Sequence, residues 1–330
     1  MERNWKQLVA VFLLGFMMPG IAIRIGSMLV HVPNTAQTQP SETINITVPS
    51  QPAHSEEVFI PVLTDSGTVQ VMELESYLLG VLLGEVPASF EMEALKAQAV
   101  VARTYTLYCT DAMDRHMGAA VCTDSTCCQS YYSEQDYITA GGLQEEVEKI
   151  RAAIAETKNQ ILTFEGSLIM ATYFSCSGGR TEDAVAVWGT DMPYLQSVES
   201  PGEEQAKVFT KTVYYTSEEF ASLLGRTLVG DPHSWIGPAT YTNGGGVALM
   251  AVAGRSYTGT ELRKLLSLNS TAFTMTADNG GIWITTTGKG HRVGMSQYGA
   301  DAMAVSGSSY TQILAHYYPG TRIDKMGAIR

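Results

Sequence analysis

One carboxylate in this chain stands where catalysis could use it. Glu85 lies in the run Gly84-Glu85-Val86-Pro87 between two segments of helical spacing, and a side chain at such a break can project into a cleft. In the second segment Lys96 and Arg103 are seven residues apart, so they share a helix face, about 10 Å apart along the axis. Two cations on one stripe would suit an anionic or polyol ligand. The residue types alone still favour the alternative, in which this stripe and Glu85 are solvated surface charges.

The spacing of cysteine and histidine indicates a second kind of chemistry. His116, Cys122 and Cys128 follow one another with five residues between neighbours, and Cys127 adjoins the last. Two thiolates and one imidazole suit zinc in tetrahedral geometry, although this is not one of the common finger spacings. A disulfide from Cys122 to Cys127 or Cys128 is the alternative that an oxidising compartment would permit. Because the chain has five cysteines, a fully paired disulfide framework is excluded.

Two glycine-rich runs carry the remaining polar chemistry. They span residues 173–181 and 288–300, and both combine small residues with hydroxyls, phenols or an amide. Glycines let a ligand approach the backbone, and such polar groups can hydrogen-bond sugar hydroxyls. The candidate binding residues are Tyr173, Ser175, Ser177, His291, Ser296, Gln297 and Tyr298. Two alternatives remain: tight turns with local caps, or a cysteine nucleophile, Cys176, with His291 as its base.

The elements that must position these residues begin at about residue 58. Apolar spacing predicts helices over residues 73–83, 91–109, 145–158, 217–224, 260–266, 293–305 and 311–317. Runs of β-forming residues predict strands over residues 58–63, 68–72, 160–164, 167–174, 271–276 and 282–287. The order follows no regular βαβ period, so we expect an α+β fold with mixed helices and short antiparallel strands.

The first 57 residues are expected to lie outside this body. Residues 8–23 are apolar, and with a weaker continuation to residue 30 they are long enough to span a bilayer. We therefore expect residues 1–30 to be a cytoplasmic stub and an uncleaved transmembrane anchor, with a cleaved signal peptide as the alternative. Residues 31–57 are rich in Pro, Thr, Ser and Gln, which indicates an extended linker. Arg3 and Lys6 precede the span, and no Lys or Arg follows it in this linker, so the body, residues 58–330, is expected outside the cell.

Composition excludes several other classes. The chain is 45% hydrophobic and 16% charged, which is incompatible with a wholly disordered protein. Its formal net charge is −12, so nothing supplies the phosphate neutralisation that general nucleic-acid binding needs.

Read together, four of these runs resemble the stage II sporulation protein D family. They are Glu85-Val86-Pro87, residues 94–105, the Ser-x-Ser-Gly-Gly run of residues 175–179, and residues 290–300. The resemblance extends in the same order from about residue 58 to the end of the chain, and the anchor and linker also fit it.

Two positions depart from the family pattern. Arg292 stands where the family usually has glycine after the histidine, which puts the local backbone or a ligand contact in doubt. Cys176 stands where the family often has serine, which argues against an essential cysteine nucleophile.

The resemblance implies a membrane-anchored lytic transglycosylase. Such enzymes cut the β-1,4 bond between N-acetylmuramic acid and N-acetylglucosamine, preferring glycan strands without stem peptides, during engulfment of the forespore. The implied location is the mother-cell membrane that engulfs the forespore, with the catalytic domain outside the cytoplasm and facing the forespore. The implied partners are an amidase, stage II sporulation protein P, and a membrane protein, stage II sporulation protein M.

The resemblance also assigns roles to residues. Glu85 aligns with the catalytic acid, and Lys96, Arg103 and Tyr173 align with residues needed near it. His116, Cys122 and Cys128 match the zinc ligands of some clostridial members, which favours zinc over a disulfide.

The implied mechanism uses one carboxylate twice. Protonated Glu85 would donate to the glycosidic oxygen and then take the proton of the muramic C6 hydroxyl, which closes on C1 to form a 1,6-anhydro end. A general acid needs a raised pKa, whereas a cation beside it lowers the pKa. We therefore expect Lys96 and Arg103 to bind the muramic lactyl carboxylate, or to be held by other acids, rather than to pair with Glu85. The alternative function is a non-catalytic glycan-binding or scaffold subunit of the engulfment complex.

Overall fold

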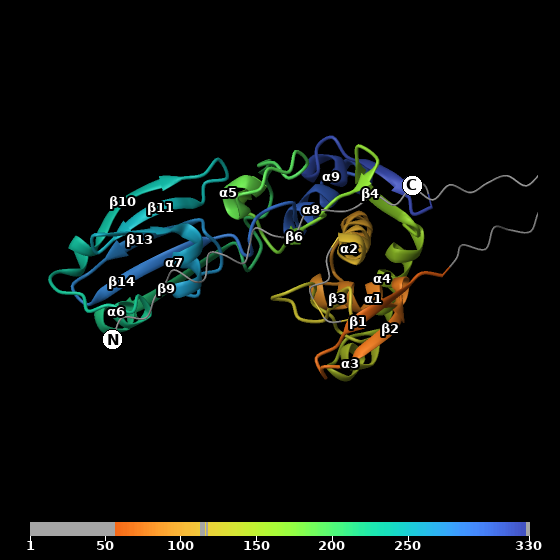
Figure 1. The fold of residues 1–330 in the computed structure, drawn as a ribbon, viewed down its shortest axis with the longest axis horizontal. Helices are drawn as coiled ribbons and strands as arrows, with labels where there is room; N and C mark the ends of the chain where they lie inside the picture. The colour runs from red at the N-terminus through yellow and green to blue at the C-terminus, as the bar shows by residue number, and fades with distance from the viewer. Residues whose placement is uncertain (1–56, 113–115, 117, 328–330) are drawn as a thin grey trace, which may run out of the picture. The chain divides into compact units, whose positions relative to one another are not determined.

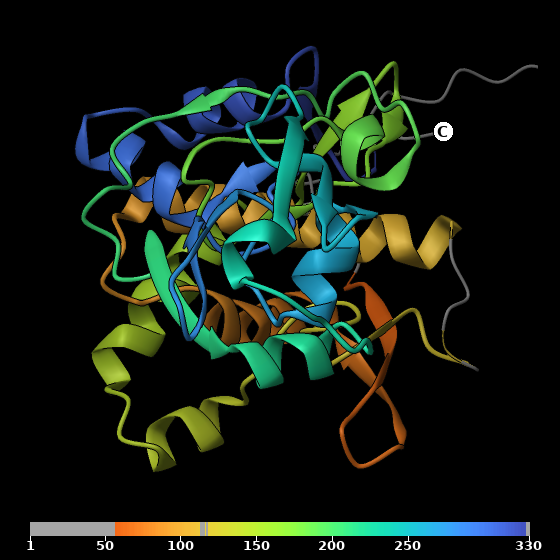
Figure 2. The same cartoon turned by 90° about the vertical axis from the view of Figure 1, so that its left-hand side faces the viewer.

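The computed structural model describes residues 57–112, 116 and 118–327 (Figures 1 and 2). Apart from Glu57, the expected anchor and linker lie outside the described residues, so they stay predictions. Over the described residues, no helix combines the length and the apolar character that crossing a membrane requires.

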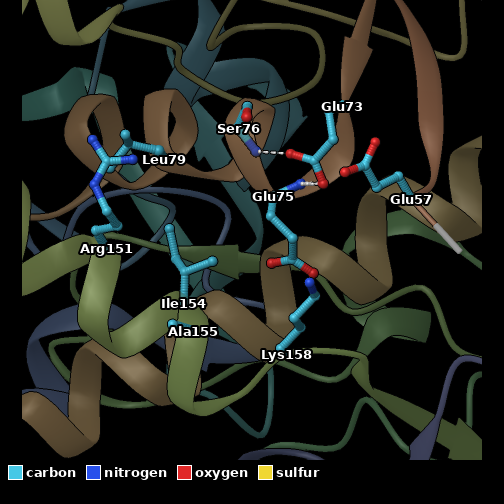
Figure 3. Close-up of a pocket in the computed structure, with 9 residues that line it drawn as sticks. All are labelled: Glu57, Glu73, Glu75, Ser76, Leu79, Arg151, Ile154, Ala155 and Lys158. Atoms are coloured by element: carbon cyan, nitrogen blue, oxygen red, sulfur yellow. Dashed lines mark hydrogen bonds between the residues drawn. The ribbon is translucent and has the colours of Figure 1, made fainter. Parts of the chain in front are cut away.

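The first helix, α1 (Leu74–Glu85), starts at a carboxylate cap. Glu73 Oε1 accepts the N–H of Glu75 at 3.1 Å, and its Oε2 accepts the N–H of Ser76 at 2.7 Å (Figure 3). These bonds satisfy donors that the first turn of a helix leaves unpaired. The helix stops at Glu85 because Val86 is extended and Pro87 cannot continue a helix.

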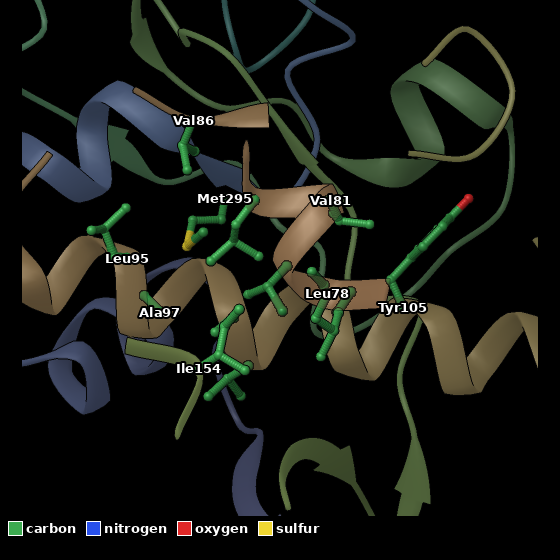
Figure 4. Packing of buried hydrophobic residues seen from close by; sticks show 14 of the residues in the cluster. Leu78, Val81, Val86, Leu95, Ala97, Tyr105, Ile154 and Met295 are labelled. Atoms are coloured by element: carbon green, nitrogen blue, oxygen red, sulfur yellow. The ribbon is translucent and has the colours of Figure 1, made fainter. Parts of the chain in front are cut away.

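Helices build the larger of two hydrophobic cores. They are α1, α2 (Met92–Ala112), α4 (Gln144–Glu156), α8 (Gln297–Val305) and α9 (Tyr310–Tyr317). Leu78, Leu95 and Ile154, from three of these helices, are buried together in this core (Figure 4). Buried alanines such as Ala97 and Ala99 let neighbours approach α2 closely. Two short helices, α3 (Glu134–Thr139) and α5 (Ala184–Trp188), complete this part.

Short sheets surround these helices. β1 (Phe59–Leu63) pairs antiparallel with β2 (Val69–Glu73) and parallel with β3 (Val121–Cys122). β4 (Gln160–Phe164) lies between β16 (Arg322–Lys325) and β5 (Ser167–Leu168). β7 (Gly179–Arg180) pairs with β8 (Glu199–Ser200), and β6 (Tyr173–Phe174) pairs parallel with β15 (Met295–Ser296). The last pairing matters most, because it joins the two glycine-rich runs.

A second hydrophobic core belongs to residues 210–287. One sheet orders β13 (Phe273–Ala277), β14 (Gly281–Thr287) and β9 (Thr210–Thr216), and another orders β10 (Ile236–Tyr241), β11 (Val247–Val252) and β12 (Arg255–Thr258). α6 (Ser217–Leu223), the 3₁₀ turn η2 (Pro232–Trp235) and α7 (Gly259–Leu265) accompany them. Phe220, Leu262 and Ile282 are buried there.

The predicted α+β class is confirmed, with one correction to the strands. Two pairs, β1 with β3 and β6 with β15, are parallel rather than antiparallel. The strand expected over residues 167–174 is two strands in different sheets, β5 and β6. The helix expected from residue 293 begins at Gln297, because Ser296 caps it by accepting the N–H of Gly299.

Candidate functional site

Glu85 is half-buried at the end of α1 and lines a cavity of about 740 Å³. That volume lies within the range of small-ligand sites in proteins. Among the described residues that line the cavity, Glu85 is the only acid. The cleft expected at this helix break is therefore present.

Two glycines of α1 bring a backbone donor to Glu85. A side chain at Gly80 would collide with the Tyr131 ring, and a Cβ at Gly84 would lie 2.9 Å from Ser130 Oγ and 3.0 Å from Tyr131 N. Without side chains, both positions let residues 130–132 pack on the helix. The N–H of Ser130 then donates to Glu85 Oε1 at 2.6 Å.

The parallel pairing of β6 with β15 brings the other partners. It sets Met295 opposite Tyr173, so α8 starts beside the cavity. Gln297, at the first position of α8, donates from Nε2 to Glu85 Oε2 at 3.4 Å. The Tyr173 hydroxyl donates to Gln129 Oε1 at 3.0 Å.

These surroundings favour a protonated Glu85. Burial raises the pKa of Glu85 above its usual value, while the hydrogen bonds from Ser130 and Gln297 and the Tyr173 hydroxyl act to lower it, and the net effect is upward. Burial, and next the Glu85 carboxylate, raise the pKa of Tyr173 well above its usual value, so its hydroxyl stays a donor. A carboxyl with a raised pKa in a cavity suits general acid chemistry.

Lys96 and Arg103 do not line this cavity. Lys96 Nζ lies 2.8 Å from Glu93 Oε1 and 2.6 Å from Glu156 Oε2. Arg103 is fully buried, and its guanidinium donates to both carboxylate oxygens of Glu75 at 3.0 and 2.6 Å. It also donates to backbone carbonyls of β4 and α4. Of the two alternatives expected for these cations, other acids hold them both, and neither pairs with Glu85.

Glu75 belongs to a separate pocket at the start of α1. Figure 3 shows this pocket, which Glu57, Arg151 and Lys158 also line. It shares no lining residue with the Glu85 cavity. Glu73 caps α1 and Glu75 holds Arg103, so these two carboxylates have structural roles.

Ser177 and Cys176 face a buried carboxylate rather than the cavity. Glu203 Oε2 accepts from the Ser177 hydroxyl at 2.9 Å, from the Ser177 N–H at 2.8 Å and from Cys176 Sγ at 3.1 Å. Burial first, and then Glu203, raise the pKa of the Cys176 thiol to about 12. Cys176 is therefore a protonated structural thiol, and a pairing with His291 as nucleophile and base is not what the structure shows.

His291 lines the cavity as a neutral ring. Its Nδ1 accepts the N–H of Val293 at 3.1 Å, and the rings of Phe174 and Trp188 lie 5.6 and 5.4 Å away, centroid to centroid. Burial, and next the positive charge of Arg263, lower the pKa of His291 to about 4. It contributes hydrogen bonding and a flat surface, not charge, at neutral pH.

Arg292 adopts the conformation that glycine would adopt. Its φ is 68°, in the left-handed region, so the departure from the family pattern leaves the backbone path intact. Its buried guanidinium lies 3.1 Å from Glu182 Oε1 and donates to the carbonyls of Ser177 and Gly244, both at 2.6 Å. These bonds tie the two glycine-rich runs together.

Of the remaining predicted residues, one lines the cavity and the others pack or hydrogen-bond behind it. Ser175 lines the cavity, and its carbonyl accepts the N–H of Tyr298 at 3.0 Å. Tyr298 packs edge-on against Phe90, and Ser296 is the buried cap of α8. Ser296, Ser177 and Tyr298 thus support the site without lining it.

Several lining residues escaped prediction from the sequence. They are Tyr105, Trp188, Arg263, Asn269 and Lys289. Trp188 and Arg263 come from short helices with nothing unusual in their local pattern. Lys289 and Tyr105 lay inside runs already singled out, so only their individual roles were missed.

The predicted metal ligands come together and gain a fourth member. One ligand atom each of His116, Cys122, Cys127 and Cys128 lies within 4.8 Å of all the others. His116 Nε2 is 3.3 Å from Cys128 Sγ and 3.8 Å from Cys127 Sγ. Tetrahedral zinc with bonds of about 2.0 Å to nitrogen and 2.3 Å to sulfur sets its ligand atoms roughly 3.5–3.8 Å apart. The four donors therefore fit zinc.

Cys127 lies in the same cluster as the three expected ligands. The sequence leaves open whether this adjacent cysteine also reaches the ion, and the turn at residues 124–128 brings both thiols into the cluster. The carbonyl of Asp124 accepts the N–H groups of both Cys127 and Cys128, at 3.0 and 2.9 Å. No disulfide joins any of the five cysteines.

Comparisons with known proteins support one family. Residues 64–164 match the family model described as "Stage II sporulation protein". The chain is 37% identical over 292 residues to "Stage II sporulation protein D" of Bacillus amyloliquefaciens, covering 86% of this chain and 84% of that protein. It is 38% identical over 278 residues to the protein of the same name in Bacillus subtilis, covering 82% and 80%. It is also 30% identical over 299 residues to "Amidase enhancer" of Bacillus subtilis, covering 74% of this chain and 40% of that protein.

Proposed function

This chain belongs to the stage II sporulation protein D family, and we propose that it is a lytic transglycosylase of peptidoglycan glycan strands. One observation carries the proposal: a half-buried carboxyl with a raised pKa is the only acid among the described residues that line a ligand-sized cavity.

The proposed reaction needs one carboxyl group. Protonated Glu85 donates to the glycosidic oxygen as the bond from muramic C1 breaks. The carboxylate then accepts the proton of the C6 hydroxyl, whose oxygen bonds to C1 and leaves a 1,6-anhydro end. Glycosidases that use water ordinarily need two carboxyl groups, whereas an intramolecular hydroxyl is already positioned. A cavity with one acid fits the second case better than the first.

The neighbours of Glu85 support both steps. After proton donation, the Ser130 N–H and the Gln297 amide stabilise the carboxylate that forms. These two bonds fix the orientation of the Glu85 carboxyl group, so the same carboxylate is in place to accept the proton of the C6 hydroxyl. Tyr173 lines the same cavity, where its hydroxyl oxygen, whose hydrogen is donated to Gln129, can accept a hydrogen bond from a sugar hydroxyl.

We include zinc in the proposal as a structural cofactor. His116, Cys122, Cys127 and Cys128 would hold it. A zinc ion with four protein ligands stabilises local structure and keeps no open position for water or substrate. The residues that follow the last ligand are Gln129 and Ser130, the partners of Tyr173 and Glu85. Ordering this segment would therefore orient the catalytic carboxyl group.

The cellular role follows from the family and remains part of the proposal. The protein would act on stem-peptide-free glycan during forespore engulfment, anchored in the mother-cell membrane that surrounds the forespore, with its catalytic domain facing it. Stage II sporulation proteins P and M are the proposed partners, the first as the amidase that prepares the glycan.

A second function has its own support. The 30% identical relative is named for enhancing an amidase, which favours a non-catalytic role in the same complex. In that case the cavity would bind glycan and present it to the amidase.

Product analysis separates these functions. The full-length protein, purified in detergent, is incubated with glycan strands from which stem peptides have been removed, and the products are examined by mass spectrometry. A lytic transglycosylase leaves 1,6-anhydromuramic ends, and a hydrolase leaves reducing ends. Binding without either product would establish the non-catalytic function and overturn the proposal.

A further inference from the structure

Two cations line the Glu85 cavity. Arg263 comes from α7, and Lys289 lies two residues beyond the end of β14. Among the described residues, neither has an acidic side chain within the 4.0 Å of a salt bridge. Within the same described residues, the Arg263 side chain donates one weak hydrogen bond, from Nε to the carbonyl of Leu268 at 3.4 Å.

Arg263 differs in this respect from the two fully buried arginines. Arg103 and Arg292 each meet a carboxylate, and each also donates to backbone carbonyls. Arg263 is half-buried, and burial is what lowers the pKa of its guanidinium, with no acid acting against it. Removing an unpaired charge from water costs free energy, and an anion bound at the same place would offset that cost.

The position of Arg263 is fixed relative to the cavity. α7 begins with a capping box between Thr258 and Glu261, which fixes the start of the helix. Beyond its end, the carbonyl of Asn269 accepts the N–H of Gly290 at 3.0 Å, so this segment is bonded to the run that carries Lys289 and His291. His291 is neutral at neutral pH, and the positive charge of the cavity wall therefore comes from Arg263 and Lys289.

The chemistry of the substrate supplies a matching anion. A glycan of alternating N-acetylglucosamine and N-acetylmuramic acid carries one ionisable group per disaccharide, the lactyl carboxylate of the muramic residue. The planar guanidinium of arginine binds a carboxylate through two parallel hydrogen bonds. Building on the proposed function, we propose that Arg263, with Lys289 beside it, binds the free lactyl carboxylate of a muramic residue in the cavity.

This assignment makes the site selective for processed glycan. In intact peptidoglycan the lactyl group is joined to the stem peptide as an amide, which is neutral and carries further residues. Hydrolysis of that amide adds water across the C–N bond and frees the carboxylate and the peptide amine. The assignment would give a residue-level reason for the preference for stem-peptide-free glycan that the family resemblance implies, with Arg263 as the residue that binds the freed carboxylate. Binding of the lactyl carboxylate, which we expected of Lys96 and Arg103 unless other acids hold them, is thus assigned to Arg263 and Lys289.

Binding to matched ligands tests the proposal without turnover. The full-length Glu85→Gln protein is titrated calorimetrically with a muramic acid-containing tetrasaccharide and with its carboxyl methyl esters, which keep the shape and remove the charge. We expect the free acid to bind about 10- to 100-fold more tightly, the range for hydrogen bonds to charged groups. Adding Arg263→Gln should abolish this preference, and Arg263→Lys should retain part of it.

A neighbouring lysine provides the control. Lys264 is exposed on the same helix and does not line the cavity, so Lys264→Gln should keep the full preference. Circular dichroism checks that each variant folds. Equal affinity for acid and ester, or a preference that survives Arg263→Gln, would overturn the proposal.

The two proposals can fail separately. If the wild type produces 1,6-anhydro ends but cleaves acid and ester equally well, the Arg263 assignment is wrong and the enzyme assignment stands. If no cleavage occurs and the preference for the acid still depends on Arg263, the carboxylate site stands and the enzyme assignment is wrong.

Discussion

At the scale of single residues, the site depends on which charged side chains form ion pairs and which do not. Among the residues that the structure describes, Glu85 has hydrogen-bond donors but no cationic partner, whereas Lys96 and Arg103 are each held by acids. Arg263 lines the same cavity as Glu85, and within the described part of the chain it forms no salt bridge with any acid. A proton donor and an anion-binding group are thus present in one cavity without neutralising each other.

The pH dependence of cleavage should report the raised pKa of Glu85. A general acid works when protonated, so the rate should fall as pH rises through that pKa. Removing a donor to the carboxylate raises the pKa further, because the donor stabilises the charged form. Gln297→Leu should therefore move the alkaline limb of kcat/KM to higher pH, as measured by initial rates across a pH series.

Gln70 offers the matched control, because it is exposed on β2 and does not line the cavity. Gln70→Leu should leave the limb where it is. An unchanged limb in Gln297→Leu would show that Gln297 does not act on the titrating group.

Cys176 should be dispensable for catalysis. Its thiol donates to Glu203, and a hydroxyl can make the same bond. Cys176→Ser should keep cleavage within about twofold of wild type, because the buried hydroxyl keeps the bond to Glu203, whereas loss of a nucleophile would remove nearly all activity. Loss of product with an intact fold would restore the cysteine as a catalytic candidate.

At the scale of elements, the site depends on close approach between α1 and residues 130–132. Gly80 and Gly84 lie one helical turn apart, and both face this segment. The carbonyl of Gly80 also accepts the N–H of Tyr132 at 2.9 Å. The donor of Ser130 reaches Glu85 only while this contact is kept.

Gly84→Ala should disturb that contact. The added methyl would press on the backbone N of Tyr131, which cannot move as a flexible side chain can. Overpacking of this kind costs about 1–3 kcal/mol, and the longer Ser130–Glu85 bond should lower the cleavage rate as well. Denaturant titration and initial rates measure the two effects.

Gly327→Ala is the control for Gly84→Ala, since a Cβ there meets no atom within 4 Å. It should change neither quantity. If Gly84→Ala behaves like this control, the close approach is not needed.

Zinc binding should depend on all four clustered residues, His116, Cys122, Cys127 and Cys128. Purified protein should contain about one zinc ion per chain, and Cys122→Ser should contain little. Because Cys127 joins the cluster, Cys127→Ser should bind zinc more weakly than wild type, as measured by competition with a chromophoric chelator. Zinc removal should also speed hydrogen exchange at the Ser130 amide, which bonds to Glu85.

Wild-type zinc affinity in Cys127→Ser would reduce the ligand set to the three residues first expected. A wild-type protein without metal and with Cys122 in a disulfide would contradict the zinc assignment altogether.

The sequence predicted the local elements better than their partners. α1 and α2 follow from helical spacing, and the break at Pro87 located Glu85. Glu93 lies three residues before Lys96 on α2 and was within reach of helix spacing, whereas Glu75 and Glu156 come from α1 and α4, which the spacing along α2 does not reveal. Spacing places residues on one helix face and does not say which helix will cover it.

The contact between the two glycine-rich runs could not be predicted from the sequence either. They are more than a hundred residues apart, and the two-residue strands β6 and β15 that join them are too short to leave a pattern. β10, β11 and β12 went unpredicted, and with them the sheet that adjoins α7. Arg263 was missed for this reason, since nothing in its own helix marks it as facing a cavity.

At the scale of the whole molecule, the cavity collects residues from both hydrophobic cores. Glu85 follows the buried face of α1, whereas Arg263 and Leu268 belong to α7 and the segment after it. A rigid arrangement of the two cores would hold a proton donor and a carboxylate-binding group at a fixed spacing along one glycan. The anchor and linker expected in residues 1–57 would keep this cavity close to the membrane.

The central claim is that Glu85 transfers the proton, and one substitution tests it most directly. Glu85→Gln keeps the shape and can still bond to Ser130 through its side-chain oxygen, but it cannot cycle a proton. Its rate of 1,6-anhydro product formation on stem-peptide-free glycan should fall at least about 100-fold, with folding intact. Glu204→Gln, at an exposed acid that does not line the cavity, should retain the wild-type rate. Near-normal cleavage by Glu85→Gln would contradict the account and move the catalytic role to another residue.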